Sequence, residues 1–148
     1  MWKKVRGAAC CVFVVLVSGS AIAADTSMQF DLVCDLKGHL VQDNPALPAN
    51  VRPKKENWDD SGARFIIDLA AMKYCDTDCR TLFVDPIVSV TDKEIVLFDR
   101  SGIKDTIRRA DNYFYQRNEY YKGLVTELKG FCRKVKFSGI PANAKQRN

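Results

Sequence analysis

Histidine, the residue most often used for acid–base and metal chemistry, is scarce here: it occurs once in 148 residues, at His39. A Ser-His-Asp hydrolase would have to use that residue, and no G-x-S-x-G nucleophile turn accompanies it. Glycine-rich phosphate-binding motifs are also absent. Asp59 and Asp60 are neighbours in a proline-containing stretch, which does not define a general acid and base. We therefore expect a protein that is not an enzyme, with no catalytic residues and no cofactor.

Long hydrophobic runs are lacking as well. The apolar stretch 8–17 is about ten residues long, whereas a spanning helix needs about 20. It follows Lys3, Lys4 and Arg6 and precedes small residues that end in the sequence AIA at 21–23. This pattern predicts a signal peptide, residues 1–23, and a periplasmic or secreted protein without a transmembrane anchor. An anchor that is never cleaved is the alternative.

Removal of the signal peptide would leave 125 residues, enough for one modest domain. Residues 24–99 contain 14 acidic and 8 basic residues, whereas residues 100–148 contain 4 and 12. Such asymmetry can mark an anion-binding face. It can also reflect two halves of one fold that attract each other, which the mixing of basic with apolar residues favours.

Four cysteines follow the expected cleavage site: Cys34, Cys75, Cys79 and Cys132. An even number in a small exported domain indicates two disulfides. We expect Cys75–Cys79 as a short loop, and Cys34–Cys132 as a bond that joins the first strand to the last.

The stretch MKYCDTDCR, which contains Cys75 and Cys79, admits two other interpretations. A metal site could add Asp76, Asp78 or His39, but zinc sites usually have a second matched cysteine pair. A redox site would favour C-x-x-C, whereas the spacing here is C-x₃-C, and the flanking aspartates would raise the thiol pKa. We therefore expect no metal and a structural disulfide.

Alternation of apolar and polar residues predicts strands. In QFDLVCD, Phe30, Leu32 and Cys34 alternate with polar residues that include Asp31. In RFIIDLA the residues expected to point inward are Phe65, Ile67 and Leu69, and those expected to point outward are Arg64 and Asp68.

Three later segments have the same character. IVSVTDKEIVLFD predicts a hairpin with a turn at TDKE, and TIRRADNYFYQRNEYY predicts two strands that break near ADN. GLVTELKGFCRKVKF predicts the last strand, in which Gly130 suggests a bulge or bend. Helical periodicity is weak, so we expect an all-β fold: an antiparallel meander of about seven or eight short strands, closed as a small barrel or curved sheet.

We expect a single β-domain over 24–138 and a flexible tail over 139–148. Within the domain, residues 41–62 form a long proline-rich loop. A loop of that length is usually functional or disordered. It is either a mobile surface excursion or a lid over a binding site, with Trp58 as its apolar anchor.

The stretch RRADNYFYQRNEYYKG interleaves aromatic and basic residues, as stacking platforms for rings do. Strand alternation would nevertheless bury half of its aromatic residues in the core. The candidate ligand-binding residues are Arg108, Arg109, Arg117, Tyr113, Tyr115 and Trp58. For an exported protein the fitting partner is an anionic envelope component or an acidic protein, and not nucleic acid; the oligomeric state is not indicated.

The segments YCDTDC, EIVLFD, IRRADNYF, GFC and FSGIP, within residues 64–141, together resemble small uncharacterised exported bacterial β-rich proteins with two disulfides. The resemblance implies a disulfide-bearing β-domain and no activity. The segment FDLVCD is similar to the opening strand of periplasmic inhibitors of c-type lysozyme, without their later Ser- and Gly-containing motif. We expect a non-enzymatic domain that binds an envelope ligand or protein. The alternatives are a structural or stress-related envelope protein and an inhibitor-like module.

Overall fold

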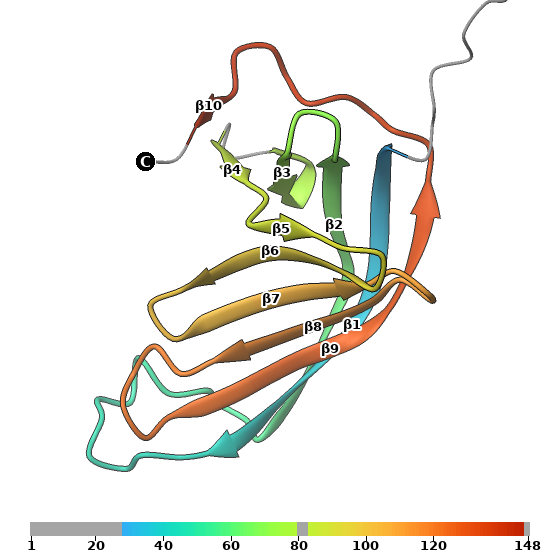
Figure 1. Cartoon of the computed structure of the whole chain (residues 1–148). Helices are drawn as coiled ribbons and strands as arrows, with labels where there is room; N and C mark the ends of the chain where they lie inside the picture. The colour runs from blue at the N-terminus through green and yellow to red at the C-terminus, as the bar shows by residue number, and fades with distance from the viewer. Residues whose placement is uncertain (1–27, 80–82, 147–148) are drawn as a thin grey trace, which may run out of the picture.

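The computed structural model describes residues 28–79 and 83–146, so the expected signal peptide lies outside the described residues. The described chain forms strands and one short 3-10 turn, and no α-helix (Figure 1). The elements are β1 (Gln29–Gln42), β2 (Asn57–Asp68), β3 (Lys73–Asp76), η1 (Thr77–Cys79), β4 (Phe83–Pro86), β5 (Ser89–Val90), β6 (Glu94–Arg100), β7 (Ile103–Arg108), β8 (Tyr113–Asn118), β9 (Val125–Val135) and β10 (Lys145–Gln146).

The strands form one sheet in the order β10-β4-β3-β2-β1-β9-β8-β7-β6-β5, which curls into a half-barrel (Figure 1). The expected all-β class and curved sheet are confirmed. Eight of these strands have four residues or more, but β1, with 14 residues, is longer than a typical strand. The sheet is also more than a meander, because β1 pairs with β9, far along the chain, and β10 pairs with β4 in parallel.

One bent segment, which includes β4 and β5, connects the two ends of the curled sheet. β4 pairs with β3, and β5 pairs with β6. Between them, the Ile87 amide donates to the Met72 carbonyl at 2.9 Å, and the Val88 amide donates to the Val96 carbonyl at 2.9 Å. Because β3 pairs with β2 only from Phe65 to Asp68, this connection joins one half of the barrel and leaves the other half open.

The main core fills the concave side of the joined half. The side chains of Phe65 and Phe114 stack there, with ring centroids 4.9 Å apart. The alternation in the sequence identifies these positions well, since strands bury every second residue. The core includes Phe30, Leu32, Cys34, Leu36, Phe65, Ile67, Leu69, Ile95, Leu97, Ile107 and Phe114.

The convex side of β1 and β2 is also buried in this half, which the sequence does not predict. Asp31 has no exposed surface and Asp68 is 7% exposed, although both were expected to point outward. The C-terminal segment covers this side near Asp31, and its Phe137, Ile140 and Ala144 pack on a second apolar cluster that contains Ile66, Cys75 and Val84. The Asp68 carboxylate accepts instead from the Gln29 side chain at 3.0 Å and from the Ala71 amide at 2.9 Å.

That C-terminal segment includes residues 139–146 of the expected flexible tail. The Ser138 amide donates to the Asp31 carboxylate at 3.2 Å, and Arg64 donates to the same carboxylate through Nε and Nη2. Further on, β10 pairs with β4. Residues 139–146 are therefore packed against the sheet and not detached from it.

Both expected disulfides are present, and the long-range one sits where the sheet bends. Cys34 and Cys132 are direct partners in the β1–β9 ladder, with Cα atoms 4.0 Å apart. Two residues on, Gly130 faces Leu36, and a Cβ added to it would lie 2.1 Å from the Asp35 carbonyl oxygen. Glycine is required there because the two backbones approach too closely for any side chain.

The two disulfides should differ in their contribution to stability. In the chain-entropy account a loop of about 100 residues contributes about 4.7 kcal/mol, and a five-residue loop about 2 kcal/mol. We expect the variant Cys34→Ser/Cys132→Ser to lose clearly more free energy of unfolding in urea than Cys75→Ser/Cys79→Ser. Equal losses would show that the bond between β1 and β9 is not the main covalent constraint.

Candidate functional site

A cavity of about 590 Å³ lies at the open end of the half-barrel. It is formed between the connection from β1 to β2 and the ends of β8 and β9. The connection covers residues 43–56 and is shorter at both ends than the expected loop 41–62, because β1 extends to Gln42 and β2 begins at Asn57. We call residues 43–56 the lid. The cavity is lined by Asn50, Val51, Arg52, Pro53, Lys54, Lys55, Trp58, Asn118, Tyr121, Leu124 and Thr126.

A few polar contacts hold the lid in place. At its base, the Leu40 amide donates to the Glu56 carbonyl at 2.7 Å. The Asn44 side chain donates to the Lys122 carbonyl at 2.8 Å, which fastens the lid to the turn between β8 and β9. Within the lid, Arg52 donates to both carboxylate oxygens of Asp43, at 2.9 and 2.5 Å.

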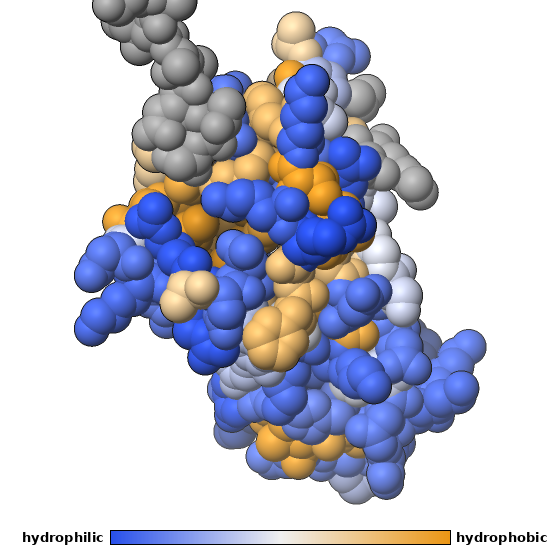
Figure 2. All heavy atoms as spheres, turned by 90° about the vertical axis from the view of Figure 1, so that its right-hand side faces the viewer, coloured by the Kyte–Doolittle hydropathy of each residue, from blue (hydrophilic) through white to orange (hydrophobic). Residues whose placement is uncertain are grey.

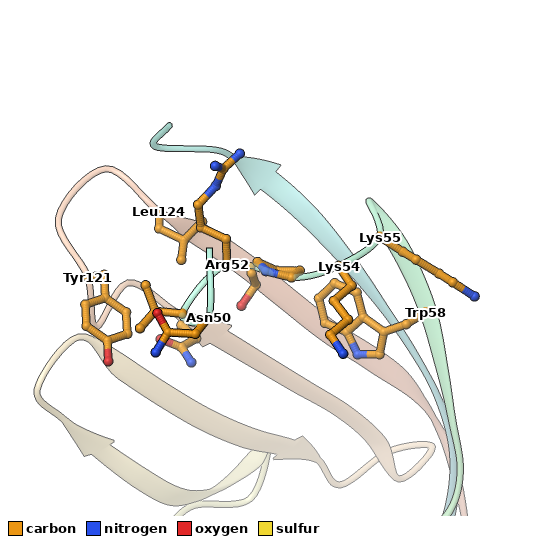
Figure 3. A pocket seen from close by; sticks show the side chains of 11 residues that line it. Asn50, Arg52, Lys54, Lys55, Trp58, Tyr121 and Leu124 are labelled. Atoms are coloured by element: carbon orange, nitrogen blue, oxygen red, sulfur yellow. The ribbon is translucent and has the colours of Figure 1, made fainter. Parts of the chain in front are cut away.

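The hydrogen bonds from Arg52 lower the pKa of the Asp43 carboxyl. The same hydrogen bonds raise the pKa of the Arg52 guanidinium. In Figure 3 the Arg52 side chain extends away from the cavity that its backbone helps to line. Arg52 therefore links two parts of the lid, and a ligand would have to compete with Asp43 for its charge.

Trp58 lies in β2 and not in the loop where the sequence analysis placed it. It pairs with Gly38 across the β1–β2 ladder. A Cβ added to Gly38 would lie 2.0 Å from Cε2 of the indole, and 2.3 and 2.4 Å from two of the atoms bonded to it, Cζ2 and Nε1. A point in the ring plane beside Cε2 would lie closer to Cζ2 and Nε1 than to Cε2 itself. Because both of these distances are longer than the distance to Cε2, the added Cβ would lie over the ring face and not at its edge. The indole therefore rests face-on against the backbone of Gly38.

The cavity walls combine apolar surface with uncharged polar groups and a basic rim. Leu124, Val51 and Pro53 provide aliphatic surface, and Tyr121 stands across the cavity from Trp58 in Figure 3. Two carboxamides and one aliphatic hydroxyl come from Asn50, Asn118 and Thr126. Lys54 and Lys55 supply positive charge, although Lys55 extends outward in this view. None of the lining residues is acidic.

The aromatic–basic stretch mostly faces the opposite side of the sheet. Tyr115 and Arg117 lie on the convex face of β8, where both contact Glu127 of β9. The Tyr115 hydroxyl donates to Glu127 at 2.8 Å, and Lys129 and His39 lie 3.2 and 3.3 Å from the same carboxylate. The hydrogen bond from Tyr115 is the main reason why the pKa of Glu127 is lowered.

Arg108 and Tyr113 belong to the same convex face. Arg108 binds both carboxylate oxygens of Asp111 and lies over the Tyr113 ring at 4.9 Å. Tyr113 meets Phe131 edge-on at 4.9 Å, and Phe131 is 62% exposed. The Arg109 guanidinium donates to the Thr91 carbonyl at 2.6 Å.

The six candidate ligand residues therefore do not meet in one site. Trp58 lines the cavity with residues that the sequence analysis did not single out as ligands, chiefly Asn118, Leu124 and Lys54. The other five lie on the convex face or at the turns beside it. Strand alternation predicts part of this division. Asn118 is an odd number of positions from Tyr113, Tyr115 and Arg117, so its side chain faces the opposite side of the sheet.

A carboxyl group on β7 continues the concave face toward the core. Asp105 pairs with Gln116, two residue pairs along the ladder from Ile103 and Asn118. Burial is the main cause that raises the pKa of Asp105 to about 6; Gln116 opposes the shift and the charge of Asp76 adds to it. Among the described residues, no hydrogen-bond partner satisfies the buried Oδ1 of Asp105.

Within residues 28–79 and 83–146, no group of three or more His, Cys, Asp or Glu side chains is arranged to hold a metal ion. No helix in this part of the chain is long and apolar enough to cross a membrane. Comparisons with models of protein families, with curated proteins and with solved structures gave no match.

The raised pKa of Asp105 predicts a pH-dependent stability. The folded protein binds this proton more tightly than the unfolded chain, whose carboxyl has a pKa of 3.8. The ionised carboxyl therefore costs folding free energy as the pH rises from about 4 to 6. We expect Asp105→Asn to raise the free energy of unfolding at pH 7.5 by up to about 3 kcal/mol, and to change it little at pH 3.5. Urea unfolding at both pH values measures this, and an equal effect at the two would contradict it.

Proposed function

We propose that this protein is a non-enzymatic, exported domain that binds an anionic, partly apolar molecule of the cell envelope in the cavity under the lid. The observation that carries the proposal is the lining of the cavity: basic residues without any acidic one, around aromatic and aliphatic walls. Such a lining favours a negative charge at the rim and apolar surface inside.

The size and construction of the cavity support binding. Its volume of about 590 Å³ lies within the usual range for small-molecule sites, about 300–1,000 Å³. The lid adds one movable wall to a rigid sheet, and its polar contacts at Asn44, Arg52 and Leu40 are few. Segments with few stabilising contacts open at low cost, which would let a ligand enter.

The location and the lack of catalysis rest on separate arguments. Two disulfides are compatible with an oxidising compartment, as the expected signal peptide requires. The cavity lining contains no histidine, cysteine or carboxylate, the side chains that most often act as catalytic bases or nucleophiles. Binding without chemistry is the function that this set of side chains fits best.

A protein partner on the convex face is the second candidate. Phe131, 62% exposed in the middle of the sheet, lies beside Tyr113 and Arg108, and these are residue types enriched at protein interfaces. The face seen in Figure 2 is otherwise largely hydrophilic, with apolar residues in small areas. We rank this candidate second because Arg108, Arg117 and Lys129 already have carboxylate partners there.

Two dyes with the same ring skeleton test the proposal. 8-Anilinonaphthalene-1-sulfonate is anionic, and N-phenyl-1-naphthylamine lacks the sulfonate. Trp58 is the only tryptophan after residue 23, so its fluorescence reports on the cavity directly. We expect the anionic dye to bind more tightly than the neutral one and to quench Trp58, with an affinity that falls as salt rises.

Lys54→Ala should weaken binding of the anionic dye about fivefold, equivalent to about 1 kcal/mol, and leave the neutral dye unchanged. Lys145→Ala, which removes the same charge from β10, is the matched control and should change neither. Equal effects of the two substitutions would show that only net charge matters and would overturn the assignment of the cavity. Thermal unfolding of each variant verifies that the dye reports on the folded protein.

A further inference from the structure

We propose that the ligand of this cavity is an acidic sugar, whose pyranose ring stacks on the free face of Trp58 and whose carboxylate lies at Lys54. This inference rests on the proposed function, because it names the ligand class of the same cavity. It depends on three features: the packing of the indole on Gly38, the uncharged polar side chains in the walls, and the position of the positive charge of Lys54.

The first feature is the indole itself. One face of Trp58 lies on Gly38, and the ring also lines the cavity. Gly38 is not among the glycines with a positive φ, so its backbone does not need glycine for conformational freedom. What requires glycine is the close contact with the indole. Because Trp58 also belongs to a strand paired with β1, the structure holds the ring as a fixed flat platform.

A fixed flat platform suits a flat partner. The C–H face of a pyranose ring or the face of an aromatic ring can cover an indole, and stacking of a ring on an aromatic side chain is favourable, as in nucleic-acid sites. A flexible acyl chain would lose conformational freedom to lie on the same surface. The platform alone therefore favours a ring over a chain.

The second feature separates a sugar from an apolar ring. Asn50, Asn118, Tyr121 and Thr126 contribute two carboxamides and two hydroxyls to the walls. These groups both donate and accept hydrogen bonds, as sugar hydroxyls do. An acyl chain or an unsubstituted aromatic ring would displace water from those polar groups that have no protein partner, which is unfavourable. At Asn118 this applies to the amide NH₂, because the carboxamide oxygen already accepts from the Tyr120 amide at 3.0 Å.

The third feature adds the negative charge. Arg52 is paired with Asp43, and Figure 3 shows Lys55 directed outward, so Lys54 is the remaining basic side chain of the cavity lining that can meet a ligand. A carboxylate on the sugar ring would meet it without competition, because the cavity has no acidic lining. A neutral sugar would gain nothing from this group.

The test titrates the full mature chain with trigalacturonate, with its trimethyl ester and with decanoate, and follows Trp58 fluorescence and the heat of binding. Trigalacturonate presents rings with carboxylates, the ester presents the same rings without charge, and decanoate presents the charge on an acyl chain. We expect trigalacturonate to bind at least tenfold more tightly than decanoate, and its ester about fivefold more weakly than the acid.

Two variants test the platform. Gly38→Ala forces the indole away from β1, because the new Cβ would overlap the ring. It should weaken trigalacturonate binding at least tenfold. Asn118→Ala, which leaves the indole seated, should weaken it severalfold. Lys145→Ala, on β10 and not part of the cavity lining, is the control and should have no effect.

The outcomes separate this inference from the proposed function. If decanoate and the anionic dye bind but trigalacturonate does not, the ligand is an anionic amphiphile. The sugar inference is then wrong, and the proposed function of the cavity as a binding site is retained. If trigalacturonate binds equally well to wild type and to a folded Gly38→Ala protein, it does not use the platform, and the inference fails. If neither the dye nor any of the three probes binds, both proposals fall. Trp58→Leu checks the platform again, by heat of binding, if Gly38→Ala does not fold.

Discussion

The pairing of β1 with β9 is the contact on which the rest of the structure depends. It joins residues about 100 positions apart, it is closed by the Cys34–Cys132 bond, and it places β1 between β2 and β9 in the middle of the sheet. Beside the disulfide, Gly130 lets the two backbones approach more closely than any other residue would allow. Glycines and bulges allow a sheet to curl, and a register shift between Cys34 and Asp35 lies at this point. The curl creates a concave side that can hold both a core and a cavity.

That concave side has two regions with different composition. Toward the disulfide, the connection through β4 and β5 closes the barrel, and the interior is filled by Phe65, Phe114 and their aliphatic neighbours. Beyond Gly38, no strand of the described chain closes the barrel, and the lid covers the opening instead. Asp105 lies between the two regions, where it is buried enough to resist ionisation but has no partner for one oxygen. The cavity is therefore the part of the barrel that the strands leave unfilled.

Local patterns predicted much of the fold, because strand alternation reports which residues share a face. The core positions Phe30, Leu32, Cys34, Phe65 and Ile67 follow from it directly. It failed for Asp31, because the residues that cover it come from the C-terminal segment, which no local pattern connects to β1. It failed for Asp68 as well, whose carboxylate accepts from the Gln29 side chain and the Ala71 amide. It also failed for Trp58: the sequence NWDDSG has no apolar alternation, since this end of β2 has no further strand beside it and most of its residues are exposed.

The site was harder to predict than the fold for a related reason. The stretch from Arg108 to Lys122 is rich in aromatic and basic residues, but the side chains of β8 within it lie on two opposite faces of the sheet. Tyr113, Tyr115 and Arg117 go to the convex face, where carboxylates on β9 and in nearby turns satisfy the basic residues. Asn118 goes to the cavity, and Tyr121 joins it from the turn that follows. Which of these residues meet Trp58 depends on the curl and on the lid, and both are tertiary features.

The charge asymmetry between the two halves of the chain does not by itself predict where charges meet in the structure. The pairs Arg64–Asp31, Arg108–Asp111 and Lys129–Glu127 each join residues of the same half of the sequence, so the basic half is not simply neutralised by the acidic one. The basic residues of the cavity nevertheless come from the acidic half, in the lid. Asp43 occupies Arg52, and the surfaces that could oppose Lys54 within the cavity carry no carboxylate. The local absence of acidic residues, and not the net charge of either half, is what makes this cavity suited to an anion.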